Sequence, residues 1–241
     1  MTNPTIVVVP GAWQKPTFFE NFCQKLRDAG YPTEQVVLPS VGGHELPLAG
    51  LPEDVAAVQA VLARLTQQGK RVILLGHSSG GAVASNAAEG FDVDGIIYTT
   101  AFAVPKGVCM MDLMGGKPLH WMDVQGDRVY GKPELLPEVA FNDLDAEAQS
   151  KWAKELTHQS AALYAVPSNY EPWTNGVPCG YIFCTDDNAL PLSLQQQMAA
   201  MLNPGPAVAS LKAGHCPHVS MPDDFVRAVR DVQQKLPRKG Q

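Results

Sequence analysis

Short apolar runs alternate with amphipathic segments along most of this chain, and that alternation limits the fold more than any other feature of the sequence. The apolar runs, typical of buried strands, lie at residues 5–9, 35–38, 71–75, 95–99, 181–184 and 208–211. Segments with apolar residues at helical spacing lie between them, at residues 18–29, 52–68, 79–89, 192–202 and 223–236. Because strands that alternate with helices pair in parallel, the sequence predicts an α/β fold with a mainly parallel sheet covered by helices on both faces.

The composition fits one folded core and excludes several classes of protein. Hydrophobic residues make up 45% of the 241 residues and charged residues only 17%, against about 25% in a typical domain. Disordered chains and coiled coils contain fewer hydrophobic and more charged residues, so both classes are excluded. The formal net charge is −6 and the basic residues are scattered, so we expect neither nucleic acid nor a membrane as a partner.

The cysteines and the lengths of the apolar runs indicate in which cellular compartment the protein is expected. The run at residues 6–9 is too short to be the core of a signal peptide, and no run approaches the roughly 18 residues of a membrane span. The five cysteines are an odd number without a C-x-x-C pair, which favours reduced thiols. We therefore expect a cytoplasmic protein, as a monomer or a homodimer.

Residues 104–178 break the alternation. They contain a Gly115-Gly116 pair, several prolines and a cluster of methionines, and they predict one clear helix, over residues 145–163. Open α/β sheets bind ligands at the carboxyl ends of their strands. We therefore predict that residues 104–178 form a helical cap over that edge, and that residues 1–103 and 179–241 form the core.

A candidate nucleophile lies between a predicted strand and a predicted helix. Residues 76–80 read Gly-His-Ser-Ser-Gly and fit the pattern G-x-S-x-G, which chance alone gives in roughly one chain in ten of this size. Here the pattern follows a buried strand and opens a helix of small residues, as a nucleophile elbow requires. We predict Ser78 as the nucleophile; the alternative is a helix entry without chemistry.

A serine hydroxyl needs a base and a carboxylate that orients the base. The loop after the strand at residues 181–184 carries two neighbouring carboxylates, Asp186 and Asp187. The residues alone leave open which of the two is the acid, and the other is a solvated turn residue.

The loop after the strand at residues 208–211 carries the candidate base. His215 lies nearer the strand end, whereas His218 is closer to the last helix and packs there or faces solvent. A zinc site built from His215, Cys216 and His218 would crowd three ligands into four residues around Pro217, which is not the spacing of such sites. We expect no metal.

Ester chemistry also needs donors for the oxyanion. The backbone N–H of Ser79, at the helix start, and that of Ala12, in the loop after the first strand, are the candidates. We interpret the remaining histidines as structural or solvated: His44, His77, His120 and His158. A role in the pocket stays open for His158, which lies in the predicted cap helix.

On these residues the chain resembles the α/β-hydrolase superfamily, in its compact branch of plant methylesterases, hydroxynitrile lyases and microbial pyrethroid and salicylate-type esterases. It is also similar to uncharacterised fungal hydrolases with Leu-Pro-Ser-Val-Gly, here at 38–42. The likeness runs through Val-Val-Pro-Gly-Ala-Trp at 8–13, Leu-Leu-Gly-His-Ser-Ser-Gly-Gly at 74–81, Ile-Ile-Tyr-Thr-Thr-Ala-Phe at 96–102, Phe-Asn-Asp-Leu-Asp at 141–145 and Ala-Gly-His-Cys-Pro-His at 213–218.

The resemblance implies roles for particular residues. In this branch the acid precedes a proline by four residues, which implies Asp187, four before Pro191. The G-H-x-P pattern implies His215 as the base. The α/β-hydrolase fold that the resemblance implies agrees with the alternation of strands and helices.

The chain also departs from its relatives. Family members usually carry His-Gly where Pro10-Gly11 stands. Hydroxynitrile lyases place a threonine at the position of Gly11 and a lysine after the catalytic histidine, where this chain has Cys216. No cation is therefore available for cyanide.

We predict a serine hydrolase that cleaves a carboxylic ester, or a lactone, of a small to medium apolar substrate through an acyl-enzyme, without a cofactor. Candidate pocket residues are Trp13, Met114, Trp121 and Met122. A second hypothesis is a carbon–carbon lyase or cyclase that uses the same triad for acid–base chemistry. A third is a non-catalytic ligand receptor, against which the intact triad counts.

Overall fold

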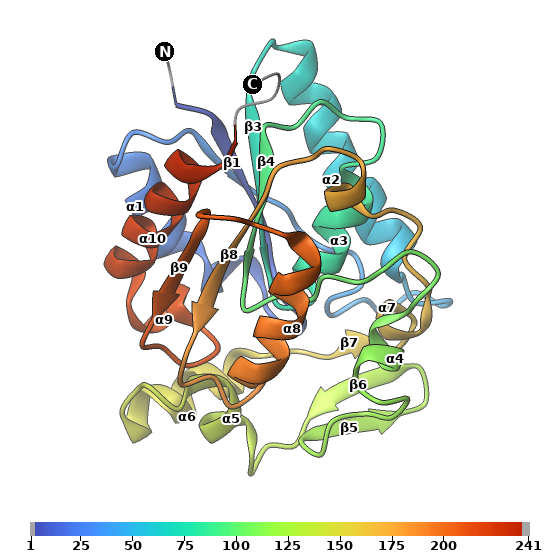
Figure 1. Ribbon diagram of the computed structural model, residues 1–241. Coiled ribbons are helices and arrows are strands. Elements are labelled where there is room, and N and C mark those ends of the chain that lie inside the picture. Colours follow the sequence, from blue (N-terminus) through green and yellow to red (C-terminus); the bar gives the residue numbers. More distant parts are fainter. Residues whose placement is uncertain (1–2, 238–241) are drawn as a thin grey trace.

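The computed structural model describes residues 3–237, which fold into a six-stranded sheet between two layers of helices (Figure 1). The strand order is β2-β1-β3-β4-β8-β9, and every neighbouring pair is parallel. The strands are β1 (Thr5–Val9), β2 (Thr33–Gln35), β3 (Val72–His77), β4 (Gly95–Thr99), β8 (Cys179–Cys184) and β9 (Val208–Leu211). The predicted α/β fold with a mainly parallel sheet is confirmed.

Helices cover both faces of this sheet. One face carries α1 (Glu20–Asp28), the short α9 (Pro217–Ser220) and α10 (Pro222–Lys235); the other carries α2 (Leu51–Gln67), α3 (Gly80–Ala87) and α8 (Leu192–Leu202). Along β1, Ile6 and Val8 pack in the first layer, and Val7 and Val9 pack in the second. Both faces of the strand are buried, which explains its unbroken apolar run. Within residues 3–237, no helix combines the length and the apolar character that crossing a bilayer requires.

The edge strand β2 differs from its prediction. The strand expected at residues 35–38 lies earlier, over Thr33–Gln35. After it, the Val36 N–H donates to the Val8 carbonyl at 3.0 Å, and Val37 is already 66% exposed. Because an edge strand pairs on one side only, little holds the chain to the sheet beyond this point.

Residues 104–178, all of which the structure describes, contribute no strand to the six-stranded sheet. Their small strands and the helices α5 (Leu136–Phe141) and α6 (Ala146–Glu155) lie across the carboxyl ends of the sheet, and the last part of the segment returns along the sheet to the start of β8 (Figure 1). The insertion contains four short helices, as expected for a helical cap, and in addition an antiparallel sheet of three strands that the sequence does not predict. Its strands are β5 (Met122–Gln125), β6 (Arg128–Gly131) and β7 (Gln159–Ser160), and its other two α-helices are α4 (Met110–Leu113) and α7 (Ala162–Ala165). Two 3₁₀ turns, at Pro16–Phe18 and Pro172–Thr174, complete the elements.

The helix predicted over residues 145–163 is wrong in its second half. The helix α6 ends at Glu155, and Leu156 is extended, with ψ of 146°. Gln159 then pairs with Val129 in the small sheet, so tertiary pairing overrides the local helical pattern. His158 therefore lies outside any helix, where its Nε2 donates to the Gly43 carbonyl at 2.8 Å.

The junction between β3 and α3 depends on glycines that allow a close approach. A Cβ at Gly80 would lie 2.3 Å from the carbonyl oxygens of both Val9 and Pro10. A Cβ at Gly76 would lie 2.8 Å from Gly81 Cα. The start of α3 can therefore press against the end of β1, which brings the turn at Ser78 next to the loop after β1.

We expect Gly80→Ala to lower the free energy of unfolding by about 3 kcal/mol or more, because the methyl group meets backbone oxygens that no side-chain rotation can move. Gly69→Ala is the matched control. A methyl group there meets no atom within 4 Å, although its left-handed backbone adds a strain of about 1–2 kcal/mol. Denaturant unfolding of both variants checks the expectation, and equal losses would contradict it.

Candidate active site

Ser78 occupies a strained turn between β3 and α3. Its φ is +54°, in the left-handed region that residues other than glycine rarely adopt. The neighbouring chain holds this conformation, because the Ser78 N–H donates to the Thr99 carbonyl at 3.3 Å and the Phe102 N–H donates to the Ser78 carbonyl at 2.9 Å. The turn places the Ser78 side chain beyond the end of the strand, at the wall of two cavities.

His215 connects the serine to a carboxylate. Its Nε2 lies 3.0 Å from Ser78 Oγ, and its Nδ1 lies 2.7 Å from Asp187 Oδ2. The three side chains come from the turn after β3, the loop after β9 and the loop after β8. A carboxylate that holds the Nδ1 proton leaves Nε2 free to accept a proton from the serine.

The Asp187 carboxylate is buried and held from several sides. Its Oδ1 accepts hydrogen bonds from the N–H groups of Ala189, at 2.7 Å, and Leu190, at 2.8 Å. Its Oδ2 accepts a further bond from Thr100 Oγ1. Asp186 is exposed instead, and its Oδ1 accepts from Thr185 Oγ1 at 3.0 Å. The structure therefore brings Asp187, and not Asp186, to His215.

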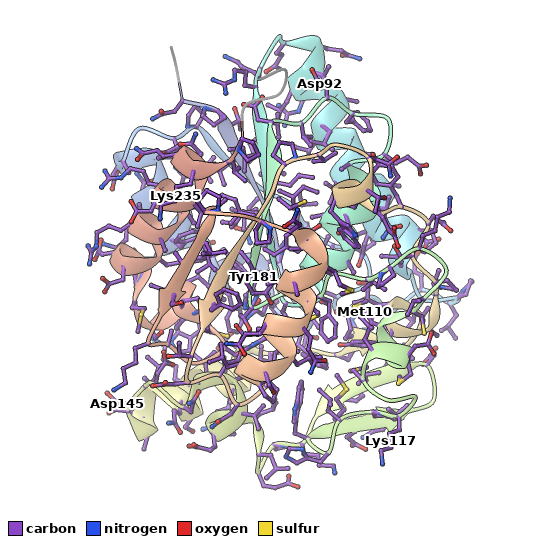
Figure 2. The ribbon with its side chains drawn as sticks, in the orientation of Figure 1. Asp92, Met110, Lys117, Asp145, Tyr181 and Lys235 are labelled. Atoms are coloured by element: carbon purple, nitrogen blue, oxygen red, sulfur yellow. The ribbon has the colours of Figure 1, made fainter. Side chains whose placement is uncertain are left out.

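Sequence reasoning assigned no role to Thr100. It lies directly after β4, with φ of +36°, and it is fully buried. The adjacent backbone is fixed by Tyr181, whose hydroxyl accepts from the Ala101 N–H at 2.9 Å and donates to the Ala101 carbonyl at 3.0 Å. Tyr181 lies in the interior, on β8 (Figure 2). The available signal in the sequence was the pair Thr99-Thr100, two polar residues inside the apolar run at 96–102.

The loop after β1 passes directly beside the nucleophile. A Cβ at Gly11 would lie 2.8 Å from Ser78 Cβ and 2.8 Å from His77 Nδ1. The next residue, Ala12, lines the larger cavity at Ser78, and Ser79 lines the smaller one. Among residues 3–237, neither the Ala12 N–H nor the Ser79 N–H has a hydrogen-bond acceptor. These two N–H groups are thus available to a ligand.

Trp13 ties this loop to the insertion. Its φ is +65°, and three hydrogen bonds hold it. Its N–H donates to Gln159 Oε1 at 3.4 Å, its indole Nε1 donates to the Val129 carbonyl at 2.7 Å, and its carbonyl accepts from the Thr157 N–H at 3.1 Å. The insertion therefore fixes the backbone next to Ala12.

A buried polar chain supports Gln159, and sequence reasoning missed it. Gln159 Nε2 donates to Ser40 Oγ at 2.6 Å. Ser40 in turn bonds Asp54 of α2 through both its hydroxyl and its N–H, the latter at 2.9 Å. Burial raises the pKa of the Asp54 carboxyl to about 6. The chain of bonds connects α2 to the loop that carries Ala12.

Two further histidines lie behind His215. His77 Nε2 donates to the His215 carbonyl at 2.8 Å, and the Gln14 amide lies 3.2 Å from His77 Nδ1. His218 stacks on Phe19, with 4.0 Å between ring centroids. Burial lowers the pKa of His77 to about 3 and lowers the pKa of His218 well below its usual value. Both rings are therefore neutral and support the loop of His215.

Two cavities border Ser78; the space inside them, counting the part open to solvent, is about 360 Å³ and about 290 Å³. They share Trp13, Ser78, Trp121, Ala189 and His215. The larger cavity has a further apolar wall, formed by residues of α5 and by one residue after α6: Leu136, Val139, Ala140, Phe141 and Leu156. The smaller one is completed mainly by Phe102, Leu119, Met122, Tyr164 and Leu190. Both walls are largely apolar.

Three of the four predicted pocket residues border these cavities. Trp13 and Trp121 line both, with their rings 5.3 Å apart edge to face, and Met122 lines the smaller one. Met114 lines neither, although it is buried in the same hydrophobic cluster as the other three. Met114 follows α4, which packs against α7, and its role in a pocket stays a prediction.

Comparison with known proteins gives the same fold and family. The model of the alpha/beta hydrolase family matches residues 6–228. An alpha/beta hydrolase of Aspergillus novofumigatus is 28% identical over 248 residues, which cover 96% of this chain and 97% of that protein. A pyrethroid hydrolase of Sphingobium wenxiniae is 30% identical over 253 residues, covering 96% and 88%. The crystal structure of a pyrethroid hydrolase from Sphingobium faniae superimposes with a TM-score of 0.79 at 29% identity, covering 97% of this chain and 98% of that one.

The neutral histidines make stability depend on pH. A buried histidine whose pKa is lowered on folding takes up its proton when the chain unfolds, so its contribution is present above its ordinary pKa of 6.5 and is lost as the pH falls below that value. We expect the free energy of unfolding to fall less steeply between pH 6.5 and 4 in His218→Gln than in the wild type. Urea unfolding across this range checks it; parallel curves would contradict it.

Proposed function

This chain belongs to the alpha/beta hydrolase family, and we propose that it is a serine hydrolase that cleaves a carboxylic ester through a covalent acyl-enzyme. One observation carries the proposal. Ser78 Oγ, His215 and Asp187 form an unbroken chain of hydrogen bonds, 3.0 Å and 2.7 Å long, at the wall of an apolar cavity. That is the arrangement in which a histidine activates a serine as a nucleophile.

In the proposed first half of the reaction, Ser78 Oγ attacks the carbonyl carbon of the ester, and its proton moves to His215 Nε2. The imidazolium that forms is stabilised by the Asp187 carboxylate at Nδ1. The carbonyl oxygen becomes an oxyanion, which the N–H groups of Ala12 and Ser79 receive. The alcohol then leaves with the proton from His215, and the acyl group stays on Ser78.

In the second half, a water molecule takes the place of the alcohol. His215 accepts a proton from the water, whose oxygen attacks the acyl carbon, and the same two N–H groups stabilise the second oxyanion. Collapse of this intermediate returns the proton to Ser78 Oγ and releases the carboxylic acid. The reaction therefore consumes one ester and one water and restores the enzyme.

We propose a small to medium, largely apolar ester as the substrate. Both cavities at Ser78 present aromatic and aliphatic walls. Two such cavities suit the two halves of an ester, the acyl group and the alcohol. The likeness to a pyrethroid hydrolase, at 30% identity, also supports a substrate of this kind.

The alternative of a hydroxynitrile-lyase type reaction is less well supported. The cavity lacks room for the threonine that those enzymes place at the position of Gly11, because even a Cβ there would lie 2.8 Å from Ser78 Cβ. Cys216 stands where they carry a lysine. Burial raises the pKa of its thiol well above the usual value, so the side chain is neutral.

We expect Ser78→Ala to fold normally and to lose about three or more orders of magnitude in the kcat for p-nitrophenyl butyrate, since only the oxyanion donors and binding then remain. A fluorophosphonate should add once to the wild-type protein, at Ser78. Kinetics and mass spectrometry of the labelled peptide check both outcomes. Labelling of Ser79, or activity retained in Ser78→Ala, would disprove the assignment.

The two neighbouring aspartates give a matched pair. Asp187→Asn should lower kcat by up to about 10⁴-fold, because an amide favours the wrong histidine tautomer. Asp186→Asn should change kcat by less than about tenfold, since its exposed carboxylate does not reach His215. Steady-state kinetics of both variants decide the matter, and a severe loss confined to Asp186→Asn would show that the acid is misplaced.

A further inference from the structure

The segment after α5 contacts both loops that carry the candidate catalytic side chains. Its residues, Asn142 and Asp143, lie in the run Phe-Asn-Asp-Leu-Asp at 141–145, and neither has a role in the site described above. We propose that Asn142 and Asp143 are positioning residues that clamp the loop of Asp187 to the loop of His215. This inference rests on the proposed function, because it concerns the geometry of the same triad.

Each residue of the pair holds one loop, one position before the catalytic side chain. Asn142 Nδ2 donates to the carbonyl of Asp186 at 2.7 Å. Asp143 Oδ2 accepts from the N–H of Gly214 at 2.9 Å. Consecutive residues of one segment thus fix the backbone directly before Asp187 and directly before His215. The relative position of these two loops sets the distance between His215 Nδ1 and the carboxylate.

The clamp closes directly on the backbone at Gly214. A Cβ at this position would lie 2.3 Å from Asn142 Oδ1 and 2.8 Å from Asp143 Oδ1. Gly214 is not among the residues with a positive φ, so its conformation does not call for glycine. Glycine is required because the side chains of Asn142 and Asp143 approach the Gly214 backbone too closely for a Cβ. This explains why a glycine precedes His215.

Bonds close to the strand ends also join the two loops. The Asp186 N–H donates to the Ala213 carbonyl at 3.0 Å and the Thr185 N–H donates to the Leu211 carbonyl at 2.9 Å. On the far side of Asp187, Asn188 Nδ2 donates to the Glu138 carbonyl of α5 at 3.1 Å. The acid loop is therefore held by the α5 region on both sides of the catalytic carboxylate, whereas Asp143 is the member that reaches the histidine loop.

The side chains of the clamp are not optimised for stability alone. Asn142 Oδ1 and Asp143 Oδ1 are buried and have no hydrogen-bond partner among residues 3–237. Leaving buried polar atoms unpaired costs free energy. The same segment continues α5, whose residues Val139 and Phe141 form the wall of the larger cavity. One segment thus shapes the pocket and aligns the triad beside it.

Four variants test the clamp. Asp143→Ala removes the acceptor of the Gly214 N–H, Asp143→Asn keeps an oxygen there, and Asn142→Ala removes the donor to Asp186. The control is Asp145→Ala in the same sequence run. The Asp145 carboxylate caps α6 by accepting from the Ala148 N–H at 2.9 Å and lies at the outer surface of the insertion (Figure 2).

We expect kcat for p-nitrophenyl butyrate to fall about 10- to 100-fold in Asp143→Ala and Asn142→Ala, because a small displacement of a catalytic group costs rate on this scale. KM should change less than about threefold, since the cavity walls stay. Asp143→Asn should recover most of the rate. Asp145→Ala should lower the melting temperature and leave kcat unchanged. All rates are measured well below each variant's melting temperature, and if Asp143→Ala does not fold, Asn142→Ala and Asp143→Asn decide.

Two results would overturn the clamp by itself while the wild type hydrolyses the ester. One is a kcat in the folded variants Asp143→Ala and Asn142→Ala within twofold of the wild type. The other is a kcat in Asp143→Asn as low as in Asp143→Ala. A wild-type protein that does not hydrolyse the ester, or does so equally as Ser78→Ala, would overturn the proposed function and the clamp with it.

Discussion

The hydrogen bond between His215 and Asp187 is the interaction on which the rest of the candidate site depends. It joins two loops that leave neighbouring strands, and it orients the imidazole toward a third segment, the turn at Ser78. Hydrogen bonds tolerate only a few tenths of an ångström of error. Loops at the end of a sheet do not keep such positions unaided, so much of the surrounding structure serves to fix them.

The insertion supplies much of this fixation. Trp13 is bonded to Gln159, Val129 and Thr157, which all belong to residues 104–178. Asn142 and Asp143, also in the insertion, bond the loops of Asp187 and His215. A cap that only covered the pocket would need apolar contacts alone. The buried polar bonds indicate that the insertion and the core form one arrangement around the triad, since leaving such groups unpaired is costly.

Three neighbouring histidines, His77, His215 and His218, have different surroundings and therefore different roles. The ring of His77 lies 4.9 Å from that of His215 and 4.8 Å from that of His218. Only His215 faces a carboxylate, and it is the ring that reaches Ser78. Burial holds the other two neutral by lowering their pKa values, so no second positive charge opposes the proton that His215 is proposed to receive.

The sequence by itself determined the parallel sheet, the helices on both faces and the elbow at Ser78, because the apolar periodicity and the glycines that close approach requires are local signals. It narrowed the acid to Asp186 or Asp187, and only a family resemblance favoured one of them. The tertiary structure decided what depends on contacts distant in sequence: the pairing of Gln159 that ends the expected helix, the bond from Thr100 to Asp187, and the placing of Met114 in the core. Such contacts leave no periodic trace in the chain, because each is formed by residues that meet only when the sheet and the insertion have folded together.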